Sequence, residues 1–204
     1  MAAEFETVTA YGIPIRVRPI APDDRARLAA MFTGLSERSR YQRFHAAKPK
    51  LSERELTYLT DVDHRRHEAL IALDAQDGSI IGVARYATAP QDHGTADLAV
   101  TVADAWQGQG IGTLLTRALL ARARENAMHE LTAISLPENG PARRVLIRLG
   151  FTLRETGDHV AGRIALGGLS PARSAARRGR GPRRTPAPGG LPGFAASSPR
   201  ACPT

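Results

Sequence analysis

A glycine-rich turn, Trp106-Gln107-Gly108-Gln109-Gly110-Ile111-Gly112, constrains this chain more than any other stretch. It follows an apolar run at residues 96–102 and precedes apolar residues at helical spacing: Ile111, Leu114, Leu115, Ala118 and Leu119. The turn therefore joins a strand to the start of a helix. Alternate glycines let a ligand approach the backbone, and the unpaired amides and dipole of a helix start favour an anion. The sequence predicts a phosphate or pyrophosphate site.

Spacing narrows the choice of ligand. The dinucleotide fingerprint needs a third glycine where this chain has Thr113 or Leu115, and the ATP loop needs a lysine that is missing after Gly112. The turn therefore argues against a nicotinamide cofactor and against ATP. What remains is Gln-x-x-Gly-x-Gly, formed by Gln107, Gly110 and Gly112. A strand-to-helix turn without a ligand is the alternative.

The positive charge of the chain is unevenly distributed. The net charge is +8, but residues 167–204 hold seven arginines and no acid, which leaves the remaining residues at +1. Since the body of the chain is balanced, nucleic-acid binding is not expected of it. The single cysteine, Cys202, excludes a disulfide framework, and no long apolar run predicts a membrane span. A cytoplasmic protein is expected.

Apolar periodicity predicts one α/β domain over residues 14–166. Strands are expected at 15–18, 68–73, 80–86, 96–102, 131–136, 151–155 and 161–166, and helices at 24–33, 36–44, 52–59, 110–126 and 141–149. This order predicts a mixed sheet of six or seven strands with helices on both faces. Residues 1–13 are expected to be a lightly ordered lead-in, and the Arg-, Pro- and Gly-rich tail at 167–204 to be disordered.

The glycine turn, together with Leu136-Pro137-Glu138-Asn139, an apolar helix and Leu149-Gly150-Phe151, resembles the GCN5-related N-acetyltransferases (GNAT). The resemblance implies a mostly antiparallel sheet in which strands 96–102 and 131–136 run parallel and splay apart around the pantetheine arm of acetyl-CoA. It also implies that the turn and the preceding strand bind this donor, through Val100, Val102, Gln107, Gly108, Gln109, Gly110, Ile111, Gly112 and Thr113. Asn139 would hydrogen-bond the pantetheine, cap the following helix, or do both.

Attack of an amine on a thioester requires a neutral amine, whereas a free lysine has a pKa near 10.4. A carboxylate acting as general base, directly or through water, can accept the proton. Asp97 occupies the place where lysine-modifying members of the family usually carry a glutamate, so we expect it to be this base. A solvated carboxylate without a catalytic role is the alternative, and Glu68, Asp104 and Glu138 are weaker candidates. The family's tyrosine acid is replaced by Leu146.

A finer resemblance covers residues 15–155, including Leu35 to Phe44 and Leu59 to Asp63, and points to the acetyltransferase domain of bacterial protein lysine acetyltransferases. It implies a protein lysine acceptor, for example on an acyl-CoA synthetase. A small amine is the alternative acceptor, and a non-catalytic acyl-CoA sensor is the competing class of protein. His64 and His67 lack a third ligand pattern, so no metal is expected. A nucleic-acid binder acting through the tail is the third class.

Overall fold

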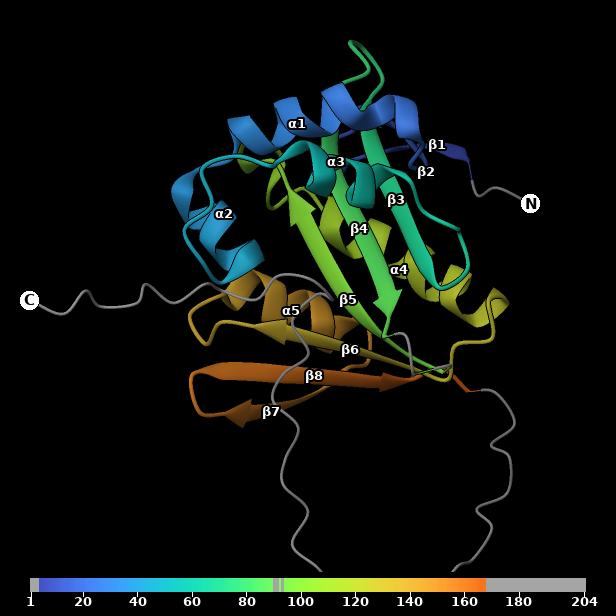
Figure 1. Cartoon of the computed structure of the whole chain (residues 1–204), viewed down its shortest axis with the longest axis vertical. Coiled ribbons are helices and arrows are strands. Elements are labelled where there is room, and N and C mark those ends of the chain that lie inside the picture. The colour runs from blue at the N-terminus through green and yellow to red at the C-terminus, as the bar shows by residue number, and fades with distance from the viewer. Residues whose placement is uncertain (1–3, 90–91, 93, 168–204) are drawn as a thin grey trace, which may run out of the picture. The chain divides into compact units, whose positions relative to one another are not determined.

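Eight strands form one mixed sheet in the computed structural model, which describes residues 4–89, 92 and 94–167 (Figure 1). The strands are β1 Phe5–Val8, β2 Pro14–Pro19, β3 His67–Asp74, β4 Ile80–Thr88, β5 Thr95–Val102, β6 Glu130–Ser135, β7 Thr152–Thr156 and β8 His159–Ala165. Their spatial order is β1-β2-β3-β4-β5-β6-β8-β7, and the pair β5 and β6 is parallel while the others are antiparallel. A parallel pair needs a crossover, which the segment between β5 and β6 provides.

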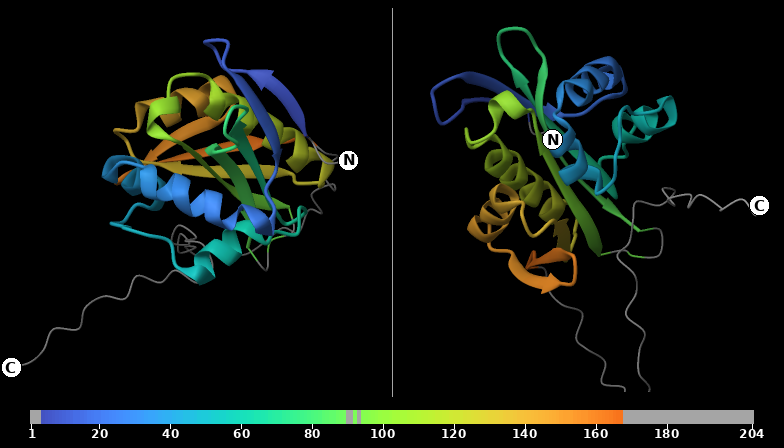
Figure 2. Two further views of the ribbon diagram at one scale, coloured as in Figure 1. Left: turned by 90° about the horizontal axis from the view of Figure 1, so that it is seen from above. Right: turned by 90° about the vertical axis from the view of Figure 1, so that its left-hand side faces the viewer.

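The helices lie on both faces of this sheet. They are α1 Arg25–Gly34, α2 Glu37–Phe44, α3 Glu53–Thr60, α4 Ile111–Glu125 and α5 Gly140–Arg148, with short 3-10 turns at η1 Pro22–Asp24 and η2 Asp104–Trp106. Figures 1 and 2 show α1, α2 and α3 on one face, with α4 and α5 on the other. The helix α4 is the crossover between β5 and β6. The expected mixed sheet with helices on both faces is confirmed.

Alternation along the strands supplies an apolar layer to each face. On β5, Ala96 and Leu98 pack in the layer that α4 covers, together with Leu115 and Leu119 of that helix. On β4, Val83 packs in the opposite layer with residues of α1 and α3. Neighbouring residues on these strands therefore point to opposite faces of the sheet. This alternation determines the face on which each polar side chain of β4 and β5 lies.

Side-chain caps fix the starts of α2 and α3. The Ser36 hydroxyl accepts a hydrogen bond from the Ser39 amide at 3.2 Å. Ser52 and Glu55 form the reciprocal capping box expected from the sequence, with the Ser52 amide donating to the Glu55 carboxylate at 2.8 Å. Both helices are short, and an isolated helix of this length is marginal in water, so caps and packing hold them against the sheet.

The structure corrects two sequence-based expectations and leaves a third outside its range. The lead-in 1–13 contains a regular strand, because β1 pairs with β2 from Phe5 opposite Val17 to Val8 opposite Pro14. The sheet consequently has eight strands instead of six or seven. The tail, apart from Gly167, lies outside the described residues.

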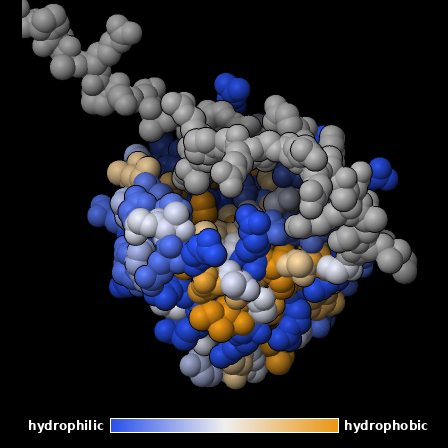
Figure 3. Space-filling model, turned by 90° about the horizontal axis from the view of Figure 1, so that it is seen from below, coloured by the Kyte–Doolittle hydropathy of each residue, from blue (hydrophilic) through white to orange (hydrophobic). Residues whose placement is uncertain are grey.

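The face toward β7 and β8 carries hydrophobic residues interspersed with hydrophilic ones (Figure 3). Large apolar side chains that remain exposed include Ile134 of β6 and Ile147 of α5. Within the described ranges, every helix is too short or too polar to cross a membrane.

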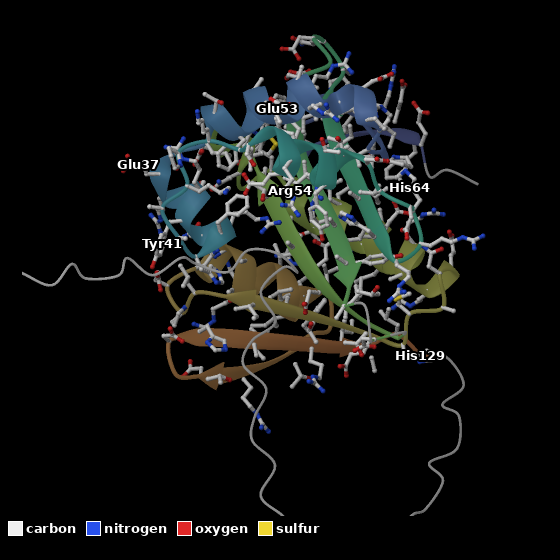
Figure 4. All side chains as sticks on the ribbon, viewed as in Figure 1. Glu37, Tyr41, Glu53, Arg54, His64 and His129 are labelled. Atoms are coloured by element: carbon white, nitrogen blue, oxygen red, sulfur yellow. The ribbon has the colours of Figure 1, made fainter. Side chains whose placement is uncertain are left out.

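A buried polar network joins α4 to β3. The Glu68 side chain is fully buried, and its carboxylate pairs with the Arg122 guanidinium at 2.9 Å and with His64 Nδ1 at 2.7 Å. Asn126 donates to the His64 carbonyl at 3.0 Å and to the Tyr86 hydroxyl at 2.7 Å. His64 comes from the loop before β3 (Figure 4). The network therefore connects β3, β4 and the C-terminal end of α4 at the side remote from the glycine turn.

Candidate functional site

The parallel strands β5 and β6 separate after a short paired region. Their pairing runs from Thr95 opposite Glu130 to Leu98 opposite Ala133, whereas β5 continues to pair with β4 as far as Val102. One edge of β5 is therefore without a strand partner beyond Leu98. An open edge of this kind offers backbone hydrogen bonds to an extended ligand.

Alternation determines which backbone groups face the open edge. The Ala103 amide donates to the Ile81 carbonyl of β4 at 2.9 Å, so Thr101 and Ala99 also direct their backbone groups toward β4. The amide and carbonyl groups of Val100 and Val102 point to the open edge. The Gln107 side chain donates to the Val102 carbonyl at 3.2 Å, which leaves both backbone groups of Val100 and the amide of Val102 facing this edge.

The glycine-rich turn follows directly and needs glycine for its backbone conformation. Gly108 has φ of 77° and Gly110 has φ of 86°, values that L side chains rarely adopt, although a Cβ at either position would meet no atom within 4 Å. A Cβ at Gly112 would lie 3.6 Å from the Val102 side chain, at ordinary contact distance. The turn is therefore open around Gly108 and Gly110 and lies against β5 at Gly112.

The first turn of α4 presents backbone amides toward this opening. The first regular helical bond runs from the Leu114 amide to the Gly110 carbonyl at 3.0 Å. The amides of Ile111, Gly112 and Thr113 precede it and have no intrahelical acceptor. Gln109 has a different contact, because its carbonyl accepts from the Ala10 amide at 3.0 Å, which ties the turn to the loop between β1 and β2. Amides and helix dipole together favour an anionic group here.

Asp104 connects the turn to α2. Its carboxylate accepts hydrogen bonds from the Ser36 amide at 2.8 Å, the Ser36 hydroxyl at 2.9 Å and the Ser39 hydroxyl at 2.6 Å. Burial alone would raise the pKa of Asp104, but these hydrogen bonds outweigh it and lower the pKa. Gln107 also donates to the Ser39 hydroxyl at 3.2 Å. Asp104 is therefore engaged in holding α2 and is a poor candidate for the base.

Asp97 lies on the opposite face of β5 from the apolar residues that contact α4. It sits in the paired region, one residue before the strands separate, and its carboxylate accepts a hydrogen bond from the Thr132 hydroxyl of β6. The residue is exposed. Its position combines access to solvent, a defined orientation and proximity to the point where the open edge begins.

The other carboxylates considered from the sequence lie elsewhere. Glu68 is buried in the network with Arg122 on the α4 side of the sheet, and β4 lies between its strand and β5. Glu138 is exposed in the turn that precedes α5. Neither has the combination of strand position and access that Asp97 has.

On the α5 side, Asn139 caps the helix, with its side-chain oxygen accepting from the Ala142 amide at 3.2 Å. The side-chain NH₂ group of Asn139 makes no hydrogen bond within the described part of the chain, so it remains available to a ligand. Leu146, at the position where the resemblance implies a tyrosine acid, is buried. The hydroxyl of Ser135, at the end of β6, is buried without a partner among the described residues.

A small cavity lies on the Asp97 face of β5. Its volume is about 40 Å³, and its walls include Ala99 and Thr101 of β5, Arg85 of β4 and Arg43 of α2. Sequence reasoning missed both arginines and Ser135. Strand alternation from Val83 would have indicated that Arg85 points inward, and alternation from Leu131 and Ala133 would have indicated the same for Ser135.

His67 lies beside this cavity and is expected to make stability depend on pH. Burial and the charge of Arg85 lower the pKa of His67 to about 4. The centroid of its ring lies 4.9 Å from that of the Tyr58 ring, and its Nε2 atom lies 3.2 Å from the Arg85 guanidinium. Between pH 6.5 and 4 the unfolded chain therefore binds the proton more readily, so the free energy of unfolding falls as pH falls, by up to about 3 kcal/mol.

Urea denaturation at several pH values, with wild type compared to His67→Phe, measures this contribution. The variant should lose stability less steeply between pH 6.5 and 4.5, a range that ends at the ordinary pKa of 4.5 for Glu55 and above that of 3.8 for Asp63, two groups whose lowered pKa reduces stability only as pH falls further. Parallel curves for the two proteins would show that His67 is not responsible. The comparison with wild type also removes the contribution of His45, whose pKa is lowered as well.

A splayed parallel pair, an open strand edge and a helix start with unpaired amides are together suited to a long ligand that carries a phosphate group at one end. Comparison with known proteins identifies the class. Residues 15–152 match the family described as Acetyltransferase (GNAT) domain. The chain is 32% identical over 142 residues to acetyltransferase PA5475 of Pseudomonas aeruginosa, covering 69% of this chain and 76% of that protein.

Two further comparisons agree. Acetyltransferase Pat of Mycolicibacterium smegmatis is 31% identical over 134 residues, which cover 66% of this chain but only 40% of Pat. The crystal structure of the GNAT domain of S. lividans PAT matches with a TM-score of 0.74 at 30% identity, over 79% of this chain and 96% of that one. The chain belongs to the GNAT family and is an acetyltransferase, and acetyl-CoA is the donor that this family uses.

Proposed function

We propose that this protein transfers the acetyl group of acetyl-CoA to the primary amine of a lysine side chain in a protein. The observation that carries the proposal is the juxtaposition, on one strand, of the open edge at Val100 and the exposed carboxylate of Asp97. The edge suits the extended arm of the donor, and the carboxylate suits deprotonation of an amine that approaches from the other face of the sheet.

In this proposal the donor lies along β5 with its pyrophosphate at the first turn of α4. The amides of Ile111, Gly112 and Thr113 bind the phosphates, Gln107, Gly108, Gln109 and Gly110 shape the loop around them, and Val100 and Val102 bind the pantetheine through their backbone. The NH₂ group of Asn139 donates to the same arm. Gln107 and Gln109 act chiefly by holding the loop, since their side chains donate to the Val102 and Ala105 carbonyls.

The reaction proceeds by attack of the amine nitrogen on the thioester carbon. Asp97 accepts the amine proton, directly or through one water molecule, because aspartate is shorter than the glutamate usual at this position. A backbone amide at the open edge, that of Val100, donates to the oxygen that becomes negative. Collapse of the tetrahedral intermediate forms the amide bond and expels the thiolate of CoA, which takes a proton from solvent.

The lysine acceptor is supported by the resemblance of residues 15–155 to the acetyltransferase domain of bacterial protein lysine acetyltransferases. An acyl-CoA synthetase is the first protein acceptor to test. A small amine is the second candidate. The positive charges of Arg43 and Arg85 near β5 suit a small acceptor that carries an acidic group. A protein that only senses acyl-CoA would bind the donor without turnover.

A thiol-release assay separates these candidates. The full chain is incubated with acetyl-CoA and, in turn, with acetyl-CoA synthetase, a lysine peptide and a panel of small amines. Acceptor-dependent release of CoA with the synthetase or peptide supports the proposal, and release with small amines alone supports the second candidate. Donor binding without release under any condition would identify a sensor.

Donor binding is expected to raise the melting temperature, and Gly110→Val to abolish the rise. A ligand that binds the native state alone stabilises it by mass action, by about 2.7 kcal/mol at a hundredfold excess over Kd. Valine at Gly110 forces a β-branched side chain into a positive-φ position at the start of α4. Thermal shift with acetyl-CoA measures both effects.

The matched control is Gly34→Ala, which changes a glycine on α1 where an added Cβ meets no atom within 4 Å. This variant should respond to acetyl-CoA as wild type does. If NADH raised the wild-type melting temperature and acetyl-CoA did not, the donor assignment would be wrong.

A further inference from the structure

The cavity beside β5 holds two positive charges and no negative one among its described lining residues. The side chain of Arg85 is only 4% exposed, whereas Arg43 is partly exposed. Burial lowers the pKa of Arg85 to about 9 and that of Arg43 to about 10, and the charge of Arg43 adds to the effect on Arg85. Both guanidiniums therefore remain charged at neutral pH.

Neither arginine forms an ion pair within the described part of the chain. The Arg85 guanidinium donates to the Leu59 carbonyl at 3.0 Å and contacts His67 Nε2 at 3.2 Å, and both of these partners are neutral at pH 7. The Arg43 guanidinium lies over the Phe44 ring at 4.7 Å. The two contacts of Arg85 satisfy part of its hydrogen-bonding capacity, and the contact of Arg43 with the ring is not a hydrogen bond, so neither charge is neutralised.

The other buried charged side chains among the described residues have partners of opposite sign. Asp24 pairs with Arg18 at 2.7 Å, Glu68 pairs with Arg122 at 2.9 Å, and Glu55 pairs with Lys48. Burying a charge without a counter-charge is costly, so the exception at Arg85 calls for an explanation. An anion that enters from outside would supply the missing charge.

The position of the cavity indicates where such an anion comes from. Arg85 lies opposite Ala99 in the sheet register, and Ala99, Thr101 and Asp97 share one face of β5 by alternation. The Asp97 carboxylate is held by Thr132 and does not pair with Arg85. The base and the cationic cavity are thus neighbours on the face from which the acceptor approaches.

We propose that the cavity between Arg43 and Arg85 binds a carboxylate group of the acceptor. The cavity has room for about three water molecules, which is close to the size of one carboxylate. A guanidinium fork matches a carboxylate geometrically, with two parallel hydrogen bonds. The walls supplied by Phe32, Phe44 and Leu28 favour an acceptor that reaches the arginines through an apolar segment.

The spacing along β5 limits the acceptor further. Ala99 and Thr101 lie two and four positions after Asp97, which corresponds to about 7 to 13 Å at the rise of a strand. The amine and the carboxylate of the acceptor are therefore separated by a short chain of that length. The carboxylate belongs either to an amino acid that is acetylated at its distal amine or to an acidic residue beside a target lysine. Both carry the same group, and the test distinguishes them.

This inference rests on the proposed acetyl transfer, and acceptors matched in pairs test it. The first pair is Nα-acetyl-lysine and its C-terminal amide. The second is a lysine peptide with blocked ends that carries Glu or Gln next to the lysine. With saturating acetyl-CoA, the carboxylate member of at least one pair should have a kcat/KM roughly 10- to 100-fold higher, the usual scale for a hydrogen-bonded charge. Preference in the first pair identifies a free amino acid, and preference in the second an acidic residue.

Variants link the preference to the cavity. Arg85→Gln and Arg43→Gln should each reduce the ratio between paired acceptors to near one, while Arg38→Gln, an exposed residue of α2, should leave it unchanged. Glu37 and Tyr41, the two α2 side chains labelled in Figure 4, are exposed and do not line this cavity. Acetyl-CoA affinity of each variant checks that the fold persists, and Arg43→Gln replaces Arg85→Gln if the latter does not fold.

Two results would overturn the inference. Equal kcat/KM values within both pairs in an active wild-type enzyme would do so, as would a preference that survives both arginine substitutions. Inactivity toward all amines would contradict the proposed function instead. In that case, thermal shifts with both pairs of acceptors still test the cavity: stabilisation by the carboxylate member of a pair alone, lost in Arg43→Gln, supports it, and no difference within either pair overturns it.

Discussion

Replacing Asp97 with asparagine is expected to lower kcat by about 10²- to 10⁴-fold, the usual scale for loss of a general base. Asparagine preserves the size of the side chain and can still accept a hydrogen bond from Thr132, so the fold and the donor site should be unaffected. The affinity for acetyl-CoA should therefore change little. Steady-state thiol release with a lysine acceptor, together with donor titration, measures the two quantities separately.

Two comparison variants define what Asp97 does. Asp97→Glu introduces the longer carboxylate that the resemblance to lysine acetyltransferases implies at this position, and the variant should keep most of the activity. Thr132→Val removes the hydrogen bond that orients the carboxylate and should reduce kcat by less than Asp97→Asn does, because the base is still present. An Asp97→Asn enzyme with wild-type kcat across the pH range would show that Asp97 is structural. A steep rise of the wild-type rate with pH would then indicate that the enzyme acts on amines that are already neutral.

Replacing Glu68 with leucine is expected to lower the free energy of unfolding by about 3 to 5 kcal/mol. The carboxylate is fully buried and pairs with Arg122, whose side chain is 13% exposed, so the substitution leaves a nearly buried guanidinium without that partner. Removing one member of a buried pair costs about this much because the remaining charge stays desolvated, and Arg122 then keeps its pair with the exposed Glu125 in place of the buried one. Urea denaturation monitored by circular dichroism measures the change.

Glu125 provides the matched control for this prediction. It also pairs with Arg122, at 2.7 Å, but its side chain is 62% exposed. Glu125→Gln should therefore cost less than about 1 kcal/mol, as exposed ion pairs do. Equal losses for the two substitutions would mean that burial does not determine the value of the pair. A small loss for Glu68→Leu would indicate that packing of the leucine compensates for the missing carboxylate.

The elements of the fold were predictable to the extent that their signals are local. Apolar periodicity predicted α4 and β5, and the capping box at Ser52 and Glu55 predicted the start of α3. The strand β1 was missed because its four residues include only two apolar side chains, Phe5 and Val8, which lie three positions apart and give no period-two alternation. It forms because β2 offers a complementary edge, which the sequence of residues 5–8 does not reveal.

For the candidate site, too, the features with local signals were predictable and the contacts between distant residues were not. The glycine turn and Asp97 were predicted from contiguous residues and a resemblance, and their roles remain predictions. The Asp104 contacts with Ser36 and Ser39 join residues that lie 65 to 68 positions apart in the sequence, so no local pattern predicts them. The cavity of Arg43 and Arg85 also depends on packing of a helix across a strand. From the sequence alone, an arginine within a strand is expected to face solvent, and only the position of the helix packed against the strand shows that it is buried.

The open edge of β5 has a consequence for the protein before its donor binds. An unpaired strand edge displays amide and carbonyl groups that can pair with a strand of another molecule, which is how edge-to-edge aggregation begins. Here the exposed stretch is short and lies between β5 and β6, so an incoming chain has little length to pair with. A pantetheine arm seated on Val100 would cover these groups, so the same contacts that position the donor would protect the folded chain from self-association.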